Sequence, residues 1–330
     1  MLKDTDYAFA TAKIRAMETK LLNREKMDAM LDAVSIDDAV KVLIEAGYGI
    51  SGGESGYDTA LADELKKTYD YINGIVPDRG IFNVFRVRND YHNLKVILKS
   101  NFLGGVDDPP FVGNGTADPG KLAEAIRENK LSDLPEIMRA AIVKATDAFN
   151  ATSDPQMIDI IFDGAAFEQM RALAGESKNP MLKRLVNENI DFINIRSFIR
   201  VKRLLKSQEF FAKVFLTGGK IERKFFTDRL TDSIESLMKD IRTYGYSKVT
   251  DPGLAGYAAT GTLTLFEKLS DDYTLDSLRG AKLLSMGIET IIAYLYARET
   301  EFKNVRMILT GKMNGIQAEA IRERLREPYV

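Results

Sequence analysis

The stretch DFINIRSFI, residues 191–199, has two relatives in the same chain: DYHNLKVIL at residues 90–98 and EFKNVRMIL at residues 301–309. All three share one pattern: an acid, an aromatic residue, any residue, Asn, an aliphatic residue, a base, any residue, an apolar residue and an aliphatic residue. The copies begin 101 and 110 residues apart, which is about one domain length. This repetition predicts three related modules, which we place at residues 1–110, 111–220 and 221–330.

Each copy of the repeat has the apolar spacing of a helix. In the middle copy Phe192, Ile195 and Ile199 fall on one helical face, with Phe198 beside them. No segment of the chain alternates between apolar and polar residues over the length of a strand. The sequence therefore predicts an all-α fold.

Helix starts are marked by capping residues. Ser35 precedes a predicted helix that Gly47 ends. Four further starts have a capping side chain directly before a proline, which fits the first helical turn because its missing N–H would be unpaired there. They are Asp118-Pro119, Asp154-Pro155, Asn179-Pro180 and Asp251-Pro252.

The repeat contains one residue that is unfavourable inside a helix. Asn93, Asn194 and Asn304 occupy the same position in the three copies. We expect each side-chain amide to bond a neighbouring backbone group or a helix end, which makes these asparagines part of the module architecture. The alternative is a contact with a partner.

Basic residues follow the repeat at helical spacing. Arg196, Arg200 and Arg203 recur at i, i+4 and i+7, with Lys202 and Lys206 beside them. Corresponding bases in the other copies are Lys95, Lys99 and Arg306. These residues are candidates for a partner interface, because complementary charge sets orientation and specificity. The alternative is a solvated helix face.

Composition excludes several classes of protein. The chain has no cysteine and one histidine, His92, so thiolate chemistry, disulfides and multi-histidine metal sites are excluded. A net charge of −2 argues against a nucleic-acid binder. The N-terminus has no apolar segment typical of a signal peptide, and the most apolar run, residues 291–297, is too short to cross a membrane. We expect no cofactor and no transmembrane segment.

Two glycine-rich patterns lack the context of a catalytic motif. Residues 47–52 match G-x-G-x-x-G and residues 49–53 match G-x-S-x-G, but both follow a predicted helix and not a strand. Gly218-Gly219-Lys220 lacks the spacing and the hydroxyl of a phosphate-binding loop. His92 stands in the variable slot of the repeat, which favours a surface helix position over acid–base catalysis. The loop at residues 103–120 is a candidate boundary.

The three repeats carry a resemblance to a known family. The chain resembles the C subunits of archaeal and bacterial A/V-type ATPases, which are the counterparts of the d subunit in eukaryotic V-ATPases. Residues 7–18 (YAFATAKIRAME), residues 85–95 (FRVRNDYHNLK) and the stretch from Ile158 to Asp163 are similar to that family. The resemblance spans nearly the whole chain.

The resemblance implies an assembly role. It implies a funnel or cup of three pseudo-threefold helical modules on the cytoplasmic face of the membrane. The funnel would join the D and F subunits of the central stalk to the proteolipid ring and would have no catalytic site. From the residues alone, two alternatives stay open: a helical-repeat interaction scaffold unrelated to the ATPase, and an enzyme that uses carboxylates and lysines in a cleft between modules.

Overall fold

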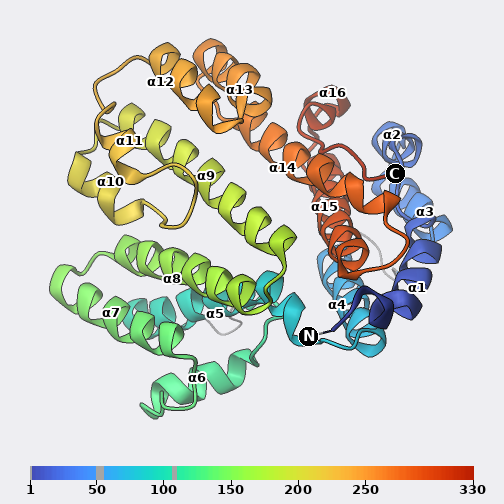
Figure 1. The fold of residues 1–330 in the computed structure, drawn as a ribbon, viewed down its shortest axis with the longest axis horizontal. Coiled ribbons are helices and arrows are strands. Elements are labelled where there is room, and N and C mark those ends of the chain that lie inside the picture. Colours follow the sequence, from blue (N-terminus) through green and yellow to red (C-terminus); the bar gives the residue numbers. More distant parts are fainter. Residues whose placement is uncertain (1, 50–55, 106–109) are drawn as a thin grey trace. The chain divides into compact units, whose positions relative to one another are not determined.

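The computed structural model describes residues 2–49, 56–105 and 110–330. These residues form helices and no strand, as the all-α prediction requires. The chain divides into two compact units (Figure 1). We call residues 1–79 with 233–330 the terminal unit, because it contains both ends of the chain, and residues 80–232 the central unit.

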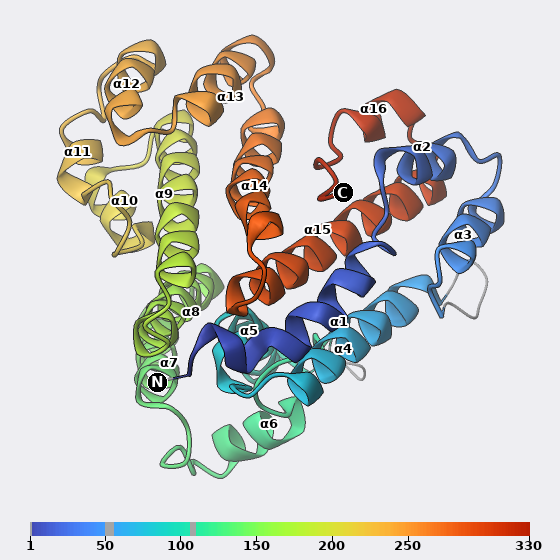
Figure 2. The ribbon, with the colours of Figure 1, turned by 45° about the vertical axis from the view of Figure 1, so that its right-hand side comes forward.

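The terminal unit is built around the longest helix, α15. Its helices are η1 (Asp4–Tyr7), α1 (Ala8–Glu18), α2 (Arg24–Asp32), α3 (Ile36–Glu45), α4 (Tyr57–Ile75), α12 (Ile234–Ile241), η3 (Arg242–Tyr244), α13 (Ser247–Thr260), α14 (Thr264–Arg279), η4 (Gly280–Leu283), α15 (Ile288–Met313) and α16 (Ala318–Arg322). Helices α1 and α4 pack along α15, as Figure 2 shows. Helix α15 is therefore the axis on which the two sequence segments of this unit meet.

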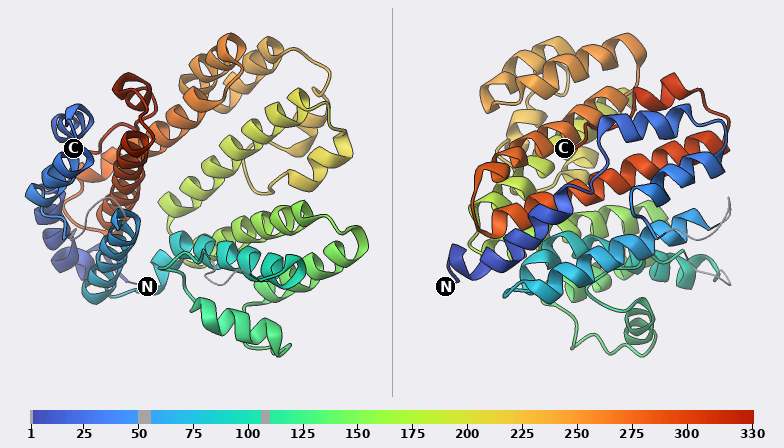
Figure 3. Two further views of the ribbon diagram at one scale, coloured as in Figure 1. Left: turned by 180° about the vertical axis from the view of Figure 1, so that it is seen from behind. Right: turned by 90° about the vertical axis from the view of Figure 1, so that its right-hand side faces the viewer.

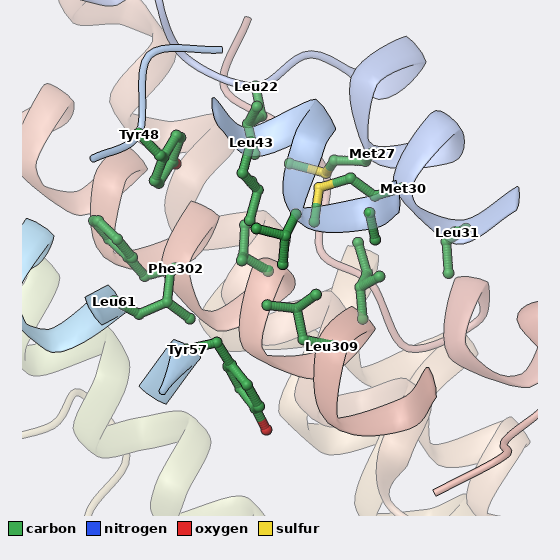
Figure 4. Close-up of a cluster of buried hydrophobic side chains, with 14 of the residues drawn as sticks. Leu22, Met27, Met30, Leu31, Leu43, Tyr48, Tyr57, Leu61, Phe302 and Leu309 are labelled. Carbon is green, nitrogen blue, oxygen red and sulfur yellow. The ribbon is translucent and has the colours of Figure 1, made fainter. Parts of the chain in front are cut away.

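A continuous hydrophobic core joins α15 to the N-terminal helices. Met27 and Met30 of α2, Leu43 of α3 and Leu61 of α4 are almost completely buried against Leu309 of α15 (Figure 4). Burial of each such side chain contributes roughly 1.5–3 kcal/mol to stability. This core holds residues 22–61 on α15 although they are separated from it by more than two hundred residues of sequence.

The central unit contains two of the three repeat copies, on α5 and α9. Its helices are η2 (Gly80–Phe82), α5 (Asn83–Leu103), α6 (Pro119–Arg127), α7 (Glu136–Thr152), α8 (Pro155–Glu176), α9 (Pro180–Arg203), α10 (Gln208–Val214) and α11 (Arg223–Thr227). Helix α8 packs against α5, α7 and α9, and Figure 3 shows α7 and α8 side by side. The rings of Phe198, Phe211 and Phe226 meet with centroids 5.3–5.5 Å apart and join α9, α10 and α11.

Three of the four predicted Asx-Pro starts are confirmed. Asp118, Asp154 and Asn179 cap α6, α8 and α9, and each side chain accepts a backbone N–H of the first helical turn at 2.9–3.0 Å. Ser35 likewise caps α3 by accepting the N–H of Asp38 at 3.1 Å. Gly47 follows the end of α3 with φ at +91°, a backbone conformation that favours glycine.

The fourth start, Asp251-Pro252, is wrong. Helix α13 already begins at Ser247 and contains Pro252, while the Asp251 carboxylate accepts from Arg242 Nε at 3.0 Å. Proline removes one backbone hydrogen bond here, and close packing against α14 offsets that loss. Gly253 permits this packing, since a Cβ there would lie 2.9 Å from the Cα of Phe266.

Part of the two glycine-rich patterns lies outside the described residues. Residues 50–55 include the ends of both patterns, and residues 106–109 lie within the predicted boundary loop. Gly47 and Tyr48, which begin the first pattern, follow α3.

Candidate functional site

The three repeat asparagines are completely buried and make the same contact. Each lies on the long helix of its repeat, α5, α9 or α15, and each carboxamide makes two hydrogen bonds to the backbone of one residue further along the chain. Nδ2 donates to the carbonyl oxygen, and Oδ1 accepts from the N–H. The pairs are Asn93 with Val112 (2.9 and 2.8 Å), Asn194 with Leu216 (2.8 and 2.9 Å) and Asn304 with Arg326 (3.0 and 2.9 Å).

In the first two copies, the acid three residues before the asparagine accepts hydrogen bonds from the segment that the asparagine also contacts. Asp90 accepts the backbone N–H groups of Thr116 and Ala117 at 2.9 and 3.1 Å. Asp191 accepts those of residues 220 and 221 at 2.9 and 3.0 Å. We call each acid–asparagine pair with the segment it holds a clamp. Burial raises the pKa of Asp90, while its hydrogen bonds with Thr116 and Ala117 act in the opposite direction.

Each of these two clamps also needs a glycine. A Cβ on Gly115 would lie 2.1 Å from Asp90 Oδ1, and a Cβ on Gly219 would lie 2.0 Å from Asp191 Oδ1. Sequence reasoning missed both residues, since it treated the first as part of a loop and the second as part of a failed phosphate-binding motif. The available signal was their spacing, 22 and 25 residues after Asn93 and Asn194.

In the third copy the acid, Glu301, forms hydrogen bonds with the N-terminal part of the chain. One oxygen of Glu301 accepts the N–H of Leu22, and the other accepts from the Tyr48 hydroxyl and from Arg298 Nη1. The Arg298 guanidinium lies 4.8 Å from the ring centroids of both Tyr48 and Phe302. Burial opposes the charge on Arg298, but Glu301 raises its pKa above the ordinary value.

The segment held by Asn304 is the C-terminal end of the chain. Asp272 of α14 accepts the N–H of Glu327 at 2.7 Å, and Lys282 donates to the carbonyl of Tyr329 at 2.7 Å. Tyr329 is only 4% exposed, so these last residues belong to the core of the terminal unit. Burial raises the pKa of Asp272 to about 6.

Three of the predicted interface bases form ion pairs within their own unit. Lys95 and Lys99 of α5 contact Asp163 and Asp159 of α8 at 2.5 and 2.7 Å. Arg306 of α15 contacts the exposed Asp58 of α4 at 2.8 Å. These pairs join neighbouring helices, so the bases already have a role in packing.

The arginine stripe lies along α9. Arg200 and Arg203 are exposed and Arg196 is half-buried. Lys202, predicted to lie beside the stripe, turns inward and donates to the carbonyl of Asp232 at 2.7 Å, and burial lowers its pKa. Arg200 and Arg203 thus form the exposed end of the stripe.

The sequence singled out one histidine and left open a cleft of carboxylates. His92 is exposed, with its Nε2 3.4 Å from the carbonyl oxygen of Pro110. No group of three or more His, Asp or Glu residues in the described ranges is placed to hold a metal ion.

No helix within residues 2–49, 56–105 and 110–330 combines the length and the apolar composition that crossing a bilayer demands.

Comparison with known proteins extends over nearly the whole chain. The family model described as ATP synthase (C/AC39) subunit matches residues 10–324. The C subunit of the V-type sodium ATPase of Enterococcus hirae is 25% identical over 319 residues, which cover 96% of this chain and 97% of that protein. The C subunits of the A-type ATP synthases of Methanocaldococcus jannaschii and Methanosarcina mazei are 24% and 22% identical and cover 97% of this chain, with 86% and 93% of their own lengths.

Proposed function

The chain belongs to the ATP synthase (C/AC39) subunit family, and on that basis we propose that it is a non-catalytic rotor component of a V/A-type ATPase. It would connect the D and F subunits of the central stalk to the proteolipid ring on the cytoplasmic face of the membrane. In this role it passes torque between the catalytic head and the ring during ATP-linked transport of H⁺ or Na⁺.

The observation that carries this proposal is the full-length match to C subunits of both V-type and A-type enzymes. A match over 96–97% of the chain leaves no large segment for a separate activity. The clamps support the same role, because the acids and asparagines that would be candidates for chemistry are occupied by backbone groups of the chain itself. These are structural contacts.

We also propose that three modules, residues 1–110, 111–220 and 221–330, surround a funnel that receives the end of the stalk. Recurrence of the asparagine contact in all three repeats supports related modules. In this arrangement the clamps bridge the module boundaries: Asp90 holds residues beyond 110, and Asp191 holds Ile221 beyond 220. Rigid connections between modules suit a part that transmits torque.

Two pull-downs test the proposal. The full chain is incubated with purified D and F stalk proteins, and separately with membranes that contain the proteolipid ring. We expect capture by both. A folded chain captured by neither would contradict the rotor role and favour a helical-repeat scaffold unrelated to the ATPase.

The exposed end of the arginine stripe is the proposed stalk contact. We expect the double variant Arg200→Glu/Arg203→Glu to bind D and F more weakly at low salt, with a smaller difference at high salt because the charges are screened. Its free energy of unfolding should stay within about 0.5 kcal/mol of the parent, since both positions are exposed. The matched control is Lys66→Glu on α4, an exposed base outside the stripe. Unchanged stalk affinity at low salt would assign the stripe to the solvated surface.

A further inference from the structure

The terminal unit contains a pocket beside the Glu301 contacts that the proposed rotor role does not use. It has a volume of about 320 Å³ and lies between α1, the segment after α3, α4 and α15. Three tyrosine rings, Tyr48, Tyr71 and Tyr294, contribute to its lining. Its size is at the lower end of the range for small-molecule sites, roughly 300–1,000 Å³.

Hydrogen-bond donors without partners face this pocket. Tyr294 is 3% exposed and lines it, yet its hydroxyl has no hydrogen-bond partner among the described residues. Burial raises the pKa of Tyr294 to about 12, so the hydroxyl keeps its proton and can donate. Lys20 also lines the pocket, and its ammonium is exposed and makes no contact within the described ranges. A ligand oxygen that accepts from these two donors forms hydrogen bonds with both, and the bond from the Lys20 ammonium is strengthened by its charge.

Arg298 adds a fixed guanidinium. Its Nη1 bonds Glu301 and Tyr48, whereas its Nη2 forms no hydrogen bond to any residue that the structure describes. Stacking between the rings of Tyr48 and Phe302 holds the group in place, so little conformational freedom remains to be lost on binding.

The charges around the pocket leave one positive charge in excess. Lys67 pairs with Glu64 at 2.7 Å, and Arg298 pairs with Glu301. Lys20 has no such counter-charge among the described residues. An anion in the pocket would therefore meet a net attraction that the partly buried surroundings strengthen.

We propose that this pocket binds a small oxyanion, a carboxylate or phosphate group, through the Tyr294 hydroxyl, Arg298 Nη2 and the Lys20 ammonium. The tyrosine rings form apolar walls for the rest of the ligand. This inference goes beyond the rotor role and does not depend on it, because every group involved belongs to one compact unit of the chain itself.

Isothermal titration of the full chain tests the proposal with three probes. Sodium phosphate and sodium benzoate distinguish the two sources of an oxyanion, and benzamide is the uncharged counterpart of benzoate. We expect saturable one-to-one binding of phosphate, benzoate or both, and none of benzamide. No saturable binding of either anion to the folded chain would overturn the proposal, as would equal binding of benzamide.

Variants locate the site. Lys20→Gln/Tyr294→Phe should weaken anion binding by about tenfold or more, because it removes two donors. The fold should be retained, since neither side chain has a hydrogen-bond partner to lose among the described residues. Lys66→Gln on α4, whose ammonium pairs with Asp70 and does not line the pocket, is the matched control and should bind as the parent does. If the double variant does not fold, Lys20→Gln alone serves. Binding unchanged in the folded variant would place the anion elsewhere and contradict the proposal.

Discussion

The clamps at Asp90 and Asp191 differ from the one at Glu301 although all three come from the same repeat motif. In the central unit the acid and the asparagine hold one continuous segment downstream. In the terminal unit Asn304 holds the C-terminal segment, whereas Glu301 holds Leu22 near the N-terminus. The same motif thus closes a local loop in the first two copies, whereas in the third copy it holds both Leu22 and Arg326.

The difference shows how the same motif can divide its contacts between two segments of the chain. Asp272 of α14 accepts the N–H of Glu327, a contact of the kind that the repeat acid makes in the other copies. Glu301 is then available for Leu22, Tyr48 and Arg298. The Glu301 contacts with Leu22 and Tyr48 span 279 and 253 residues of sequence, whereas the Asn304 contact and those of the central clamps span 19 to 30.

Removing residues 325–330 is expected to have the largest effect. The deletion removes Leu325 and Tyr329 from the core and leaves the Asn304 amide without its partner, a loss of about 5 kcal/mol or more. Hydrogen exchange should show lost protection in the terminal unit and retained protection in residues 80–232. Deletion of the exposed Val330 alone is the control. Equal loss of protection in both units would contradict the independence of the central clamps.

Glu301→Gln follows, with an expected destabilisation of about 3 kcal/mol. The variant leaves the Arg298 guanidinium partly buried without a counter-charge, which is more costly than losing the attraction itself. Urea unfolding measures the effect. Glu323→Gln, at an exposed position of the same unit, should change stability by less than about 0.5 kcal/mol. Comparable values for the two variants would show that the Glu301 cluster contributes little.

Asparagine deletions compare a central clamp with the terminal one directly. Asn194→Ala leaves the N–H and the carbonyl of Leu216 buried and unpaired, which we expect to cost about 3 kcal/mol. Asn304→Ala should cost about 1–2 kcal/mol, because Arg326 is half-buried near the chain end and water can reach its backbone more easily. Urea unfolding of both variants gives the ranking, and the reverse order would contradict this account.

Asp272 should produce a pH dependence confined to the terminal unit. Its pKa is raised to about 6 by burial, so between about pH 4 and pH 6 the folded chain keeps a proton that the unfolded chain has released. Stability from this group therefore falls as the pH rises through that window. Lys268, Asp271 and Glu327 are the charged groups around it.

Comparison with Asp272→Asn isolates this contribution. From pH 4.5 to pH 7, the urea midpoint of the parent should fall relative to that of the variant, whose side chain does not titrate. Asp276→Asn on the same helix, at an exposed position, is the matched control and should follow the parent. Parallel profiles for the parent and Asp272→Asn would show that Asp272 titrates normally.

Local signals in the sequence predicted much of the helical structure. Asp118, Asp154 and Asn179 mark helix starts because capping and the proline constraint act within a single turn. The same rule failed at Pro252, where packing of α13 against α14 extends the helix past a local stop signal. Helix boundaries could be predicted only where no tertiary contact outweighed the local preference.

The candidate sites were less predictable. The motif identified Asn93, Asn194 and Asn304 as special, but not the residues that they hold, because a hydrogen bond to a backbone group carries no side-chain signature. The glycines at 115 and 219 were missed for the same reason, since close approach of a carboxylate appears only in three dimensions. Lys95 and Lys99 looked like interface bases, and the structure pairs them with acids of α8.

The helical class, the threefold repeat and the family could be read from the amino-acid order, because periodicity, capping and family patterns are written along the chain. The segments that the third copy of the repeat holds could not be read from that order. Glu301 and Asn304 have the same motif as their counterparts, yet one holds the start of the chain and the other its end. That choice depends on which segments the core around α15 brings within hydrogen-bond distance, and burial then makes those bonds obligatory.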